Sequence, residues 1–208
     1  QSPYERNDKG YRATPSDFPT NNMVYKSVSL PINYFGNLTL ANRVFDKRLG
    51  WIVSGSIQNS YNGLNSLYFK DDLSRDGNNL PIITSMQERV YTENKKSYGV
   101  HAKLDYELNA RNRFQFYSAY LLNNNTQIRE VDETDLAVSY DPQNGTVNSI
   151  HSTRFRYNSQ SLFNSTLQSD HQITDKFSAQ WSAVYSKAIN ETPDETTVGY
   201  YTGSENFI

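Results

Sequence analysis

The stretch YGVHAKLDYEL, residues 98–108, alternates apolar side chains with glycine or polar side chains from end to end. Successive side chains of a β-strand point to opposite faces of a sheet, so a period of two places all the apolar residues on one face. A short polar turn, residues 109–112, follows directly, and the alternation resumes at Phe114. This region therefore predicts a β-hairpin with one apolar and one polar face.

Two further hairpins of the same kind are predicted, with turns at residues 46–48 and 174–176. Long polar connections, residues 59–96 and 123–151, separate the hairpins and are interpreted as loops, and a possible strand runs from Val24 to Tyr34. The expected domain is all-β and antiparallel and occupies residues 1–208, with an irregular lead-in at 1–23 and hairpins and loops over 24–208. We expect six or seven up-and-down strands, with short turns at one end and long loops at the other.

Composition excludes several function classes. The 208 residues carry 20 basic and 22 acidic side chains, so no strong positive field is present to attract nucleic acid. The absence of cysteine excludes disulfides and thiolate metal sites, and no apolar run is long enough for a membrane-spanning helix. No phosphate-binding glycine loop or serine-nucleophile motif is present, and the 3 histidines are far apart in sequence. We therefore expect no enzymatic activity, no cofactor and no metal centre.

The alternating segments are compatible with two architectures. In a soluble β-sandwich, such as a binding or adhesion module, the apolar face packs against a second sheet. In an outer-membrane barrel, the apolar face meets lipid and the polar face lines the lumen. Aromatic rings stand at Tyr98 and Tyr106, and at about 3.4 Å per residue and a typical strand tilt they span roughly 21 Å, close to the apolar band of such barrels. This spacing, the charged polar face and the one-sided loops favour the barrel.

Four stretches resemble the β-barrel part of TonB-dependent outer-membrane receptors. The most specific is LQSDHQITDKFSAQWSAVYSKAINETPD, residues 167–194, which is similar to a recurrent strand pair of that family. LDYELNARNRFQFYSAYL (104–121) and RVFDKRLGWIVSGSIQNSYNG (43–63) resemble other barrel hairpins, and GYRATPSDFP (10–19) resembles a stretch that precedes them. The likeness lies in the pattern of the strands and in the short sequences of the turns, so it indicates a family and leaves the substrate open.

The resemblance implies a transmembrane barrel of about 22 strands, plugged by a separate domain. It also implies energy-coupled uptake of a large scarce solute, an iron chelate (siderophore) or an oligosaccharide, across the outer membrane of a Gram-negative bacterium. The expected partners are outer-membrane lipid, the rest of the barrel, its plug domain, TonB acting through a more N-terminal part, and a surface lipoprotein. Because plug and TonB-contacting segments are absent from this stretch, we expect it to be an internal portion of a longer receptor. A passive porin, with the same wall and no plug, is the remaining alternative.

Three sets of site residues follow from these expectations. The residues predicted to face lipid are Tyr98, Val100, Leu104, Tyr106, Phe114, Phe116, Trp181 and Tyr185. Those predicted to face the lumen are His101, Lys103, Asp105, Arg113 and Gln115. An extracellular loop combining rings with polar groups is the predicted ligand contact, through Tyr61, Asn62, Tyr68, Phe69, Asp71, Arg75 and Asp76. The segment from Asp72 to Asn78 has the spacing of a calcium loop, but Ile83 replaces the final glutamate, so we interpret it as an Asx-rich turn.

Overall fold

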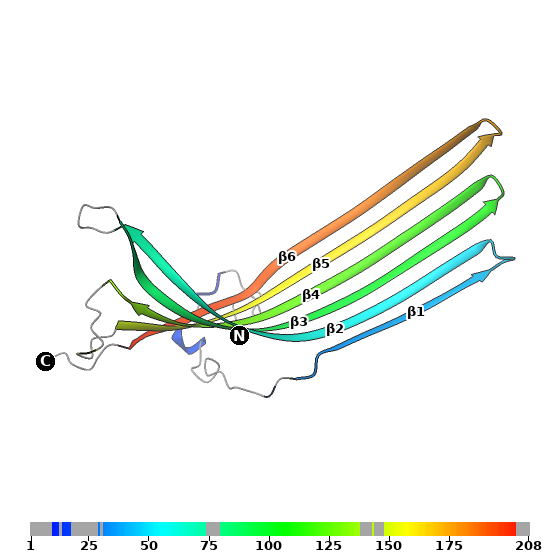
Figure 1. Ribbon diagram of the computed structural model, residues 1–208. Coiled ribbons are helices and arrows are strands. Elements are labelled where there is room, and N and C mark those ends of the chain that lie inside the picture. The colour runs from blue at the N-terminus through cyan, green and yellow to red at the C-terminus, as the bar shows by residue number, and fades with distance from the viewer. Residues whose placement is uncertain are drawn as a thin grey trace.

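The computed structural model describes residues 10–12, 14–17, 29, 31–73, 80–137, 143 and 148–202, and these form one antiparallel β-sheet preceded by a short 3-10 helix. The six strands lie in sequence order, each beside its neighbour in the chain (Figure 1). Their bounds are β1 Tyr34–Val44, β2 Leu49–Leu73, β3 Pro81–Asn109, β4 Asn112–Asp135, β5 Asn148–Thr174 and β6 Phe177–Thr202, and the 3-10 helix is Pro15–Asp17. No helix among these residues is long and apolar enough to cross a membrane.

Three short turns join the strands at one end of the sheet, as predicted (Figure 1). The turn between β1 and β2 holds Phe45, Asp46 and Lys47 at positive φ angles of 54°, 54° and 69°. The other two turns, Ala110–Arg111 and Asp175–Lys176, contain two residues each. The predicted antiparallel up-and-down order is therefore confirmed, with six strands in the described residues where six or seven were expected, and the sheet is open between β1 and β6.

The predicted long loops are wrong. Most of residues 59–96 and 123–151 is strand, and β2 pairs with β3, and β4 with β5, well beyond the alternating segments. The periodic signal fails there because both faces carry mainly polar residues, whereas backbone hydrogen bonds between strands need no alternation. The possible strand at 24–34 is also wrong where the structure describes it, because Ser29 and residues 31–33 are not in a strand and β1 begins at Tyr34.

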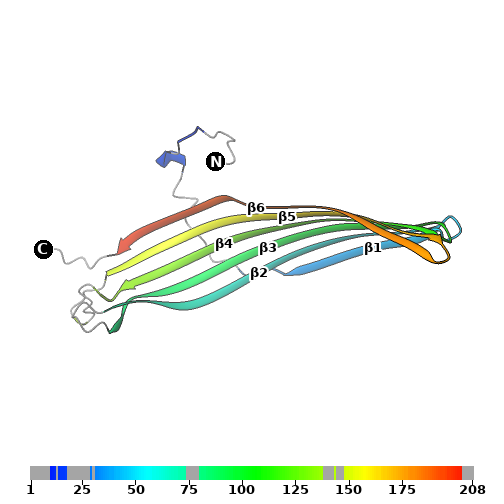
Figure 2. The same ribbon diagram turned by 90° about the horizontal axis from the view of Figure 1, so that it is seen from above.

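Register brings the apolar faces of the three hairpins together into one surface. Leu104 of β3 lies between Trp51 of β2 and Phe116 of β4, and Phe116 lies opposite Leu167 of β5. These side chains are exposed, with Leu104 at 41% and Phe116 at 37% of full accessibility. Figure 2 shows a single curved layer of strands, so within the described residues the hairpins do not pack face to face as a sandwich requires.

The apolar surface has a defined height. It extends along β3 from Tyr106, beside the short turns, to Tyr98. The next cross-strand row on the same face is polar and consists of Asn59, Lys96, Asn124 and Ser159. At about 3.4 Å per residue the apolar band is about 27 Å long along the strand, or roughly 21 Å high for a strand tilted as in a barrel.

Candidate functional site

The opposite face of the sheet is predominantly polar. It carries all the residues predicted to line a lumen, since Asp105 lies opposite Gln115 and Lys103 opposite Tyr117. His101 packs near the same Tyr117, with 6.1 Å between ring centroids. Among the described residues, apolar side chains interrupt this face in several places, including Ile52, Leu121 and Leu162.

Asp105 joins three strands near the short turns. Its carboxylate accepts hydrogen bonds from Arg113 of β4 at 2.6 and 2.7 Å and from Arg43 of β1 at 2.7 Å. Arg43 reaches across β2 because Gly50 lies between them, and a Cβ at Gly50 would come within 3.3 Å of Arg43 Nε. We name Arg43, Asp105 and Arg113 the turn-end cluster. Sequence reasoning missed Arg43, since only the strand register places it beside Asp105.

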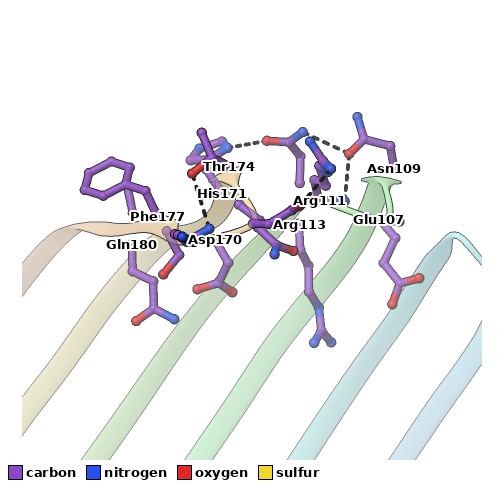
Figure 3. A pocket seen from close by; sticks show the side chains of 16 residues that line it. Glu107, Asn109, Arg111, Arg113, Asp170, His171, Thr174, Phe177 and Gln180 are labelled. Atoms are coloured by element: carbon purple, nitrogen blue, oxygen red, sulfur yellow. Dashed lines mark hydrogen bonds and ion pairs between the residues drawn. The ribbon is translucent and has the colours of Figure 1, made fainter.

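A hollow of about 630 Å³ lies between the turn of β3 and β4 and the turn of β5 and β6 (Figure 3). Glu107, Arg113 and Asp170 extend to one side of the sheet there, and His171 lies on the other. The ion pair across the two turns, Arg111 to Asp175 at 3.1 Å, is exposed. The hollow is therefore an open, mixed-charge surface formed by hairpin turns, and it has no enclosed cavity in which chemistry would be shielded from water.

Beyond the apolar band, the polar face carries a chain of bonded side chains across β2, β3 and β4. Lys70 pairs with Glu133 at 2.6 Å, and Gln87 donates to the other oxygen of Glu133 at 2.6 Å. Burial acts to raise the pKa of the Glu133 carboxyl, but hydrogen bonds, including those from Lys70 and Gln87, outweigh it and the pKa is lowered. Arg89 donates to Gln87 and lies 3.9 Å over the ring of Tyr68.

A second bonded group lies on β3, β4 and β5. Gln127 donates to Glu93 at 2.6 Å and accepts from Arg154 at 2.8 Å. Glu93 also pairs with Lys95 at 3.0 Å, and this bond and the one from Gln127 lower the pKa of its carboxyl. The half-buried Arg129 lies directly opposite Arg154 on the same face. Sequence reasoning missed this group because it assigned these segments to loops.

The predicted ligand-contact residues are in strand β2, not in a loop, as far as the structure describes them. Asn62 and Tyr68 lie on the polar face, whereas Tyr61 and Phe69 lie on the opposite face, and Asp71 follows an irregularity in register after Lys70. The strand thus divides this set between two surfaces. Arg75 and Asp76 lie outside the described residues, as does most of the predicted Asx-rich turn, whose Asp72 is in β2.

The residues predicted to face lipid share the apolar surface. Tyr106 lies opposite Phe114, and Trp181 lies opposite Ser169, in one row close to the short turns. Trp181 donates its indole N–H to His171 Nε2 at 3.2 Å, so His171 Nδ1 carries the proton and donates to Asn112 at 2.7 Å. The remaining members of the set lie in rows farther from the turns, namely Leu104, Phe116, Tyr185, Val100 and Tyr98.

No group of three or more His, Asp or Glu side chains within the described ranges is arranged to hold a metal ion. Neither a protein-family model nor a curated protein sequence matches the chain. The described residues therefore form a one-layer sheet with an apolar band on one face and hydrogen-bonded charges on the other.

Proposed function

We propose that this chain forms part of the barrel wall of a TonB-dependent receptor in the outer membrane of a Gram-negative bacterium. The receptor imports a large scarce solute, an iron chelate or an oligosaccharide, when TonB acts on its plug. The observation that carries the proposal is the exposed apolar band, which has short turns on one side and a polar row on the other. The solute path runs along the polar face.

Exposure of the band explains why lipid is the proposed partner. Burial of apolar surface contributes about 25 cal/mol per Å², and the described part of the chain has no second layer to cover Leu104, Phe116 or Trp181. A bilayer covers such a face without a protein partner. The rings near the short turns, including Tyr106, Phe114 and Trp181, match the aromatic girdle of outer-membrane barrels. Lys187, opposite Phe163 near the other edge of the band, is long enough to reach the interface.

The polar face fits a wet lumen. Several charged side chains there are paired with one another, as in the turn-end cluster, and the paired groups remain partly exposed. The open edges at β1 and β6 require further strands, because unpaired backbone groups are not tolerated in hydrocarbon. The rest of the barrel supplies those strands in the proposed receptor, and the plug occupies the space beside the polar face.

Two neighbouring positions test the orientation of the sheet. Val100→Cys and His101→Cys place a spin label on opposite faces at one height, in a chain that has no cysteine of its own. In the intact protein in lipid, we expect the label at 100 to collide with dissolved oxygen and the label at 101 with a water-soluble nickel reagent. Equal shielding of position 100 from both reagents, as in a dry protein interior, would contradict the proposal.

Energy coupling is tested by uptake. Cells that carry the intact gene are compared with cells that lack it and with cells that lack TonB, across iron chelates and oligosaccharides. We expect one solute class whose uptake requires both the gene and TonB. Uptake that needs the gene but not TonB would identify a passive porin instead.

A further inference from the structure

Three cross-strand rows on the polar face carry more positive than negative side chains. The rows pass through Arg89, Tyr91 and Glu93 of β3 and continue onto β4, β5 and β6. They place four arginines beside two glutamates, namely Arg89, Arg129, Arg154, Arg156, Glu93 and Glu195. We name the four arginines the arginine cluster. It lies beyond the apolar band, on the side away from the short turns.

Arg129 and Arg154 face each other directly across β4 and β5. Like charges in directly opposed positions of a sheet destabilise it. The Nε atom of each side chain is shielded from solvent and has no hydrogen-bond partner, and the side chain of Arg154 is only 16% exposed. Burial, followed by the charges of Arg129 and Arg156, lowers the pKa of the Arg154 guanidinium.

The nearby carboxylates are shared with other donors and compensate this pair only in part. Glu93 is bonded to Lys95 and Gln127, and Glu195 is bonded to Arg156 at 2.8 and 3.0 Å and lies 3.9 Å from Arg154. Among the described residues, no carboxylate forms an ion pair with Arg129. Arg154 donates to Gln127 and has only a carboxylate 3.9 Å away, so the charges of the two adjacent guanidiniums are incompletely compensated. Such a pair is an arrangement that accepts an oxyanion.

We infer that Arg129 and Arg154, beside the ring of Tyr91, bind a carboxylate or phosphate group of the imported solute, which is therefore an anionic molecule. This inference rests on the proposed function. In the proposed orientation, the short turns are periplasmic and the cluster lies on the extracellular side, where a solute enters. Guanidiniums bind such groups through paired N–H donors, and a neutral oligosaccharide would leave the two charges unmatched.

Calorimetric titration of the intact receptor in detergent at low salt tests the inference. The probes are citrate, inorganic phosphate and, as a neutral control, sucrose. We expect citrate to bind the wild type, and the double variant Arg129→Gln/Arg154→Gln to bind it at least about tenfold more weakly, since charge-assisted hydrogen bonds are lost. Arg111→Gln serves as the control, because it removes one arginine charge from the exposed ion pair with Asp175 at the turns; it is expected to bind citrate with wild-type affinity. Phosphate binding without citrate binding would assign the site to phosphate-bearing solutes.

Equal citrate affinity in the wild type and the double variant, or binding of neither anion to the wild type, would overturn the inference. Thermal unfolding checks the fold of the double variant, which should be at least as stable as the wild type without anion, because two opposed charges are gone. Arg129→Lys/Arg154→Lys keeps the charges and removes the two-pronged geometry, so its affinity should be intermediate. A double variant that binds citrate normally but loosens the plug would assign the cluster to a plug carboxylate instead.

The spin-label experiment separates the two proposals. If position 100 faces lipid and the titrations show no anion binding at the two arginines, the barrel proposal is supported and the inference of an anionic solute is contradicted. If the label at position 100 is shielded from both oxygen and the nickel reagent, the transporter proposal itself is contradicted.

Discussion

At the scale of single residues, Asp105 is the most connected carboxylate near the short turns. It is 9% exposed and accepts from two arginines that come from β1 and β4. Neither arginine is its neighbour in sequence, and Gly50 makes the contact with Arg43 possible by leaving the space between them open. A single carboxylate thus ties the first strand of the sheet to the fourth.

Asp105→Asn is expected to destabilise the intact protein by about 1–2 kcal/mol. The amide removes the charge that both guanidiniums share, but their side chains are 44% and 43% exposed, so water replaces part of the lost bonding. Thermal unfolding in detergent measures the change. Asp175→Asn, which removes a carboxylate at the exposed turn pair with Arg111, serves as the control and should be close to neutral. Equal effects of the two variants would argue against a special role for Asp105.

Glu93 predicts a pH dependence. Hydrogen bonds from Lys95 and Gln127 lower the pKa of its carboxyl below the ordinary value of 4.5. The stability it contributes is therefore fully present above pH 4.5 and is lost as the pH falls through the lowered pKa. Hydrogen exchange of the paired segments around Glu93 and Gln127 should accelerate in that range, and Glu93→Gln should abolish this acid-dependent step. An unchanged step in the variant would assign it to another carboxylate.

At the scale of elements, β6 shows how the long strands accommodate an irregularity. Tyr157 pairs with Asp194 and Ser159 with Glu191, so Asn158 lies opposite two residues, one of which is Pro193. Proline lacks the N–H that a ladder requires, and a bulge is a position where strands tolerate it. The side-chain amide of Asn158 donates to the backbone carbonyl of Glu191 and to the side-chain oxygens of Asn190 and Thr192, so it connects the two strands at the bulge.

Two glycines within the strands predict opposite outcomes. A Cβ at Gly99 would lie 2.7 Å from Ser56 Oγ and 3.1 Å from Leu121 Cδ2, whereas one at Gly63 would have an ordinary contact, 3.8 Å from the carbonyl oxygen of Tyr91. Gly99→Ala should therefore destabilise the β2–β3–β4 region by about 1 kcal/mol, as overpacking does. Gly63→Ala should be neutral or slightly stabilising, because glycine costs entropy in a strand. Thermal unfolding of the two variants compares them, and a neutral Gly99→Ala would mean that the strands shift to make room.

At the scale of the whole molecule, the described residues form almost no buried apolar interior. Among the described residues, Val131 is a buried hydrophobic side chain, whereas large apolar side chains such as Leu104 and Trp181 are exposed. Stability in this arrangement comes from backbone pairing, cross-strand contacts and whatever covers the apolar band. Two open edges add unpaired backbone groups at β1 and β6.

If these strands belong to a larger barrel, as we propose, the 208-residue chain alone is expected to self-associate in detergent, whereas the complete barrel should be monodisperse. Open edges and an uncovered band favour pairing between copies. Size-exclusion chromatography with light scattering measures the mass, and hydrogen exchange at β1 and β6 reports whether the edges are protected. A monomeric chain with cooperative unfolding in plain buffer would contradict the view that these strands need a surrounding barrel.

The order of residue types was enough to predict the hairpins near the short turns, because a period of two is present wherever one face is apolar and the other polar. Residues 98–108 and 163–185 therefore predicted their strands, their faces and their turns. The length of the strands and the pairing of charges depend instead on how the strands align in three dimensions. In the far half both faces are polar, so no pattern marks β2 beyond Asn59, and the opposition of Arg129 and Arg154 depends on a register that is set by pairing along the whole strand.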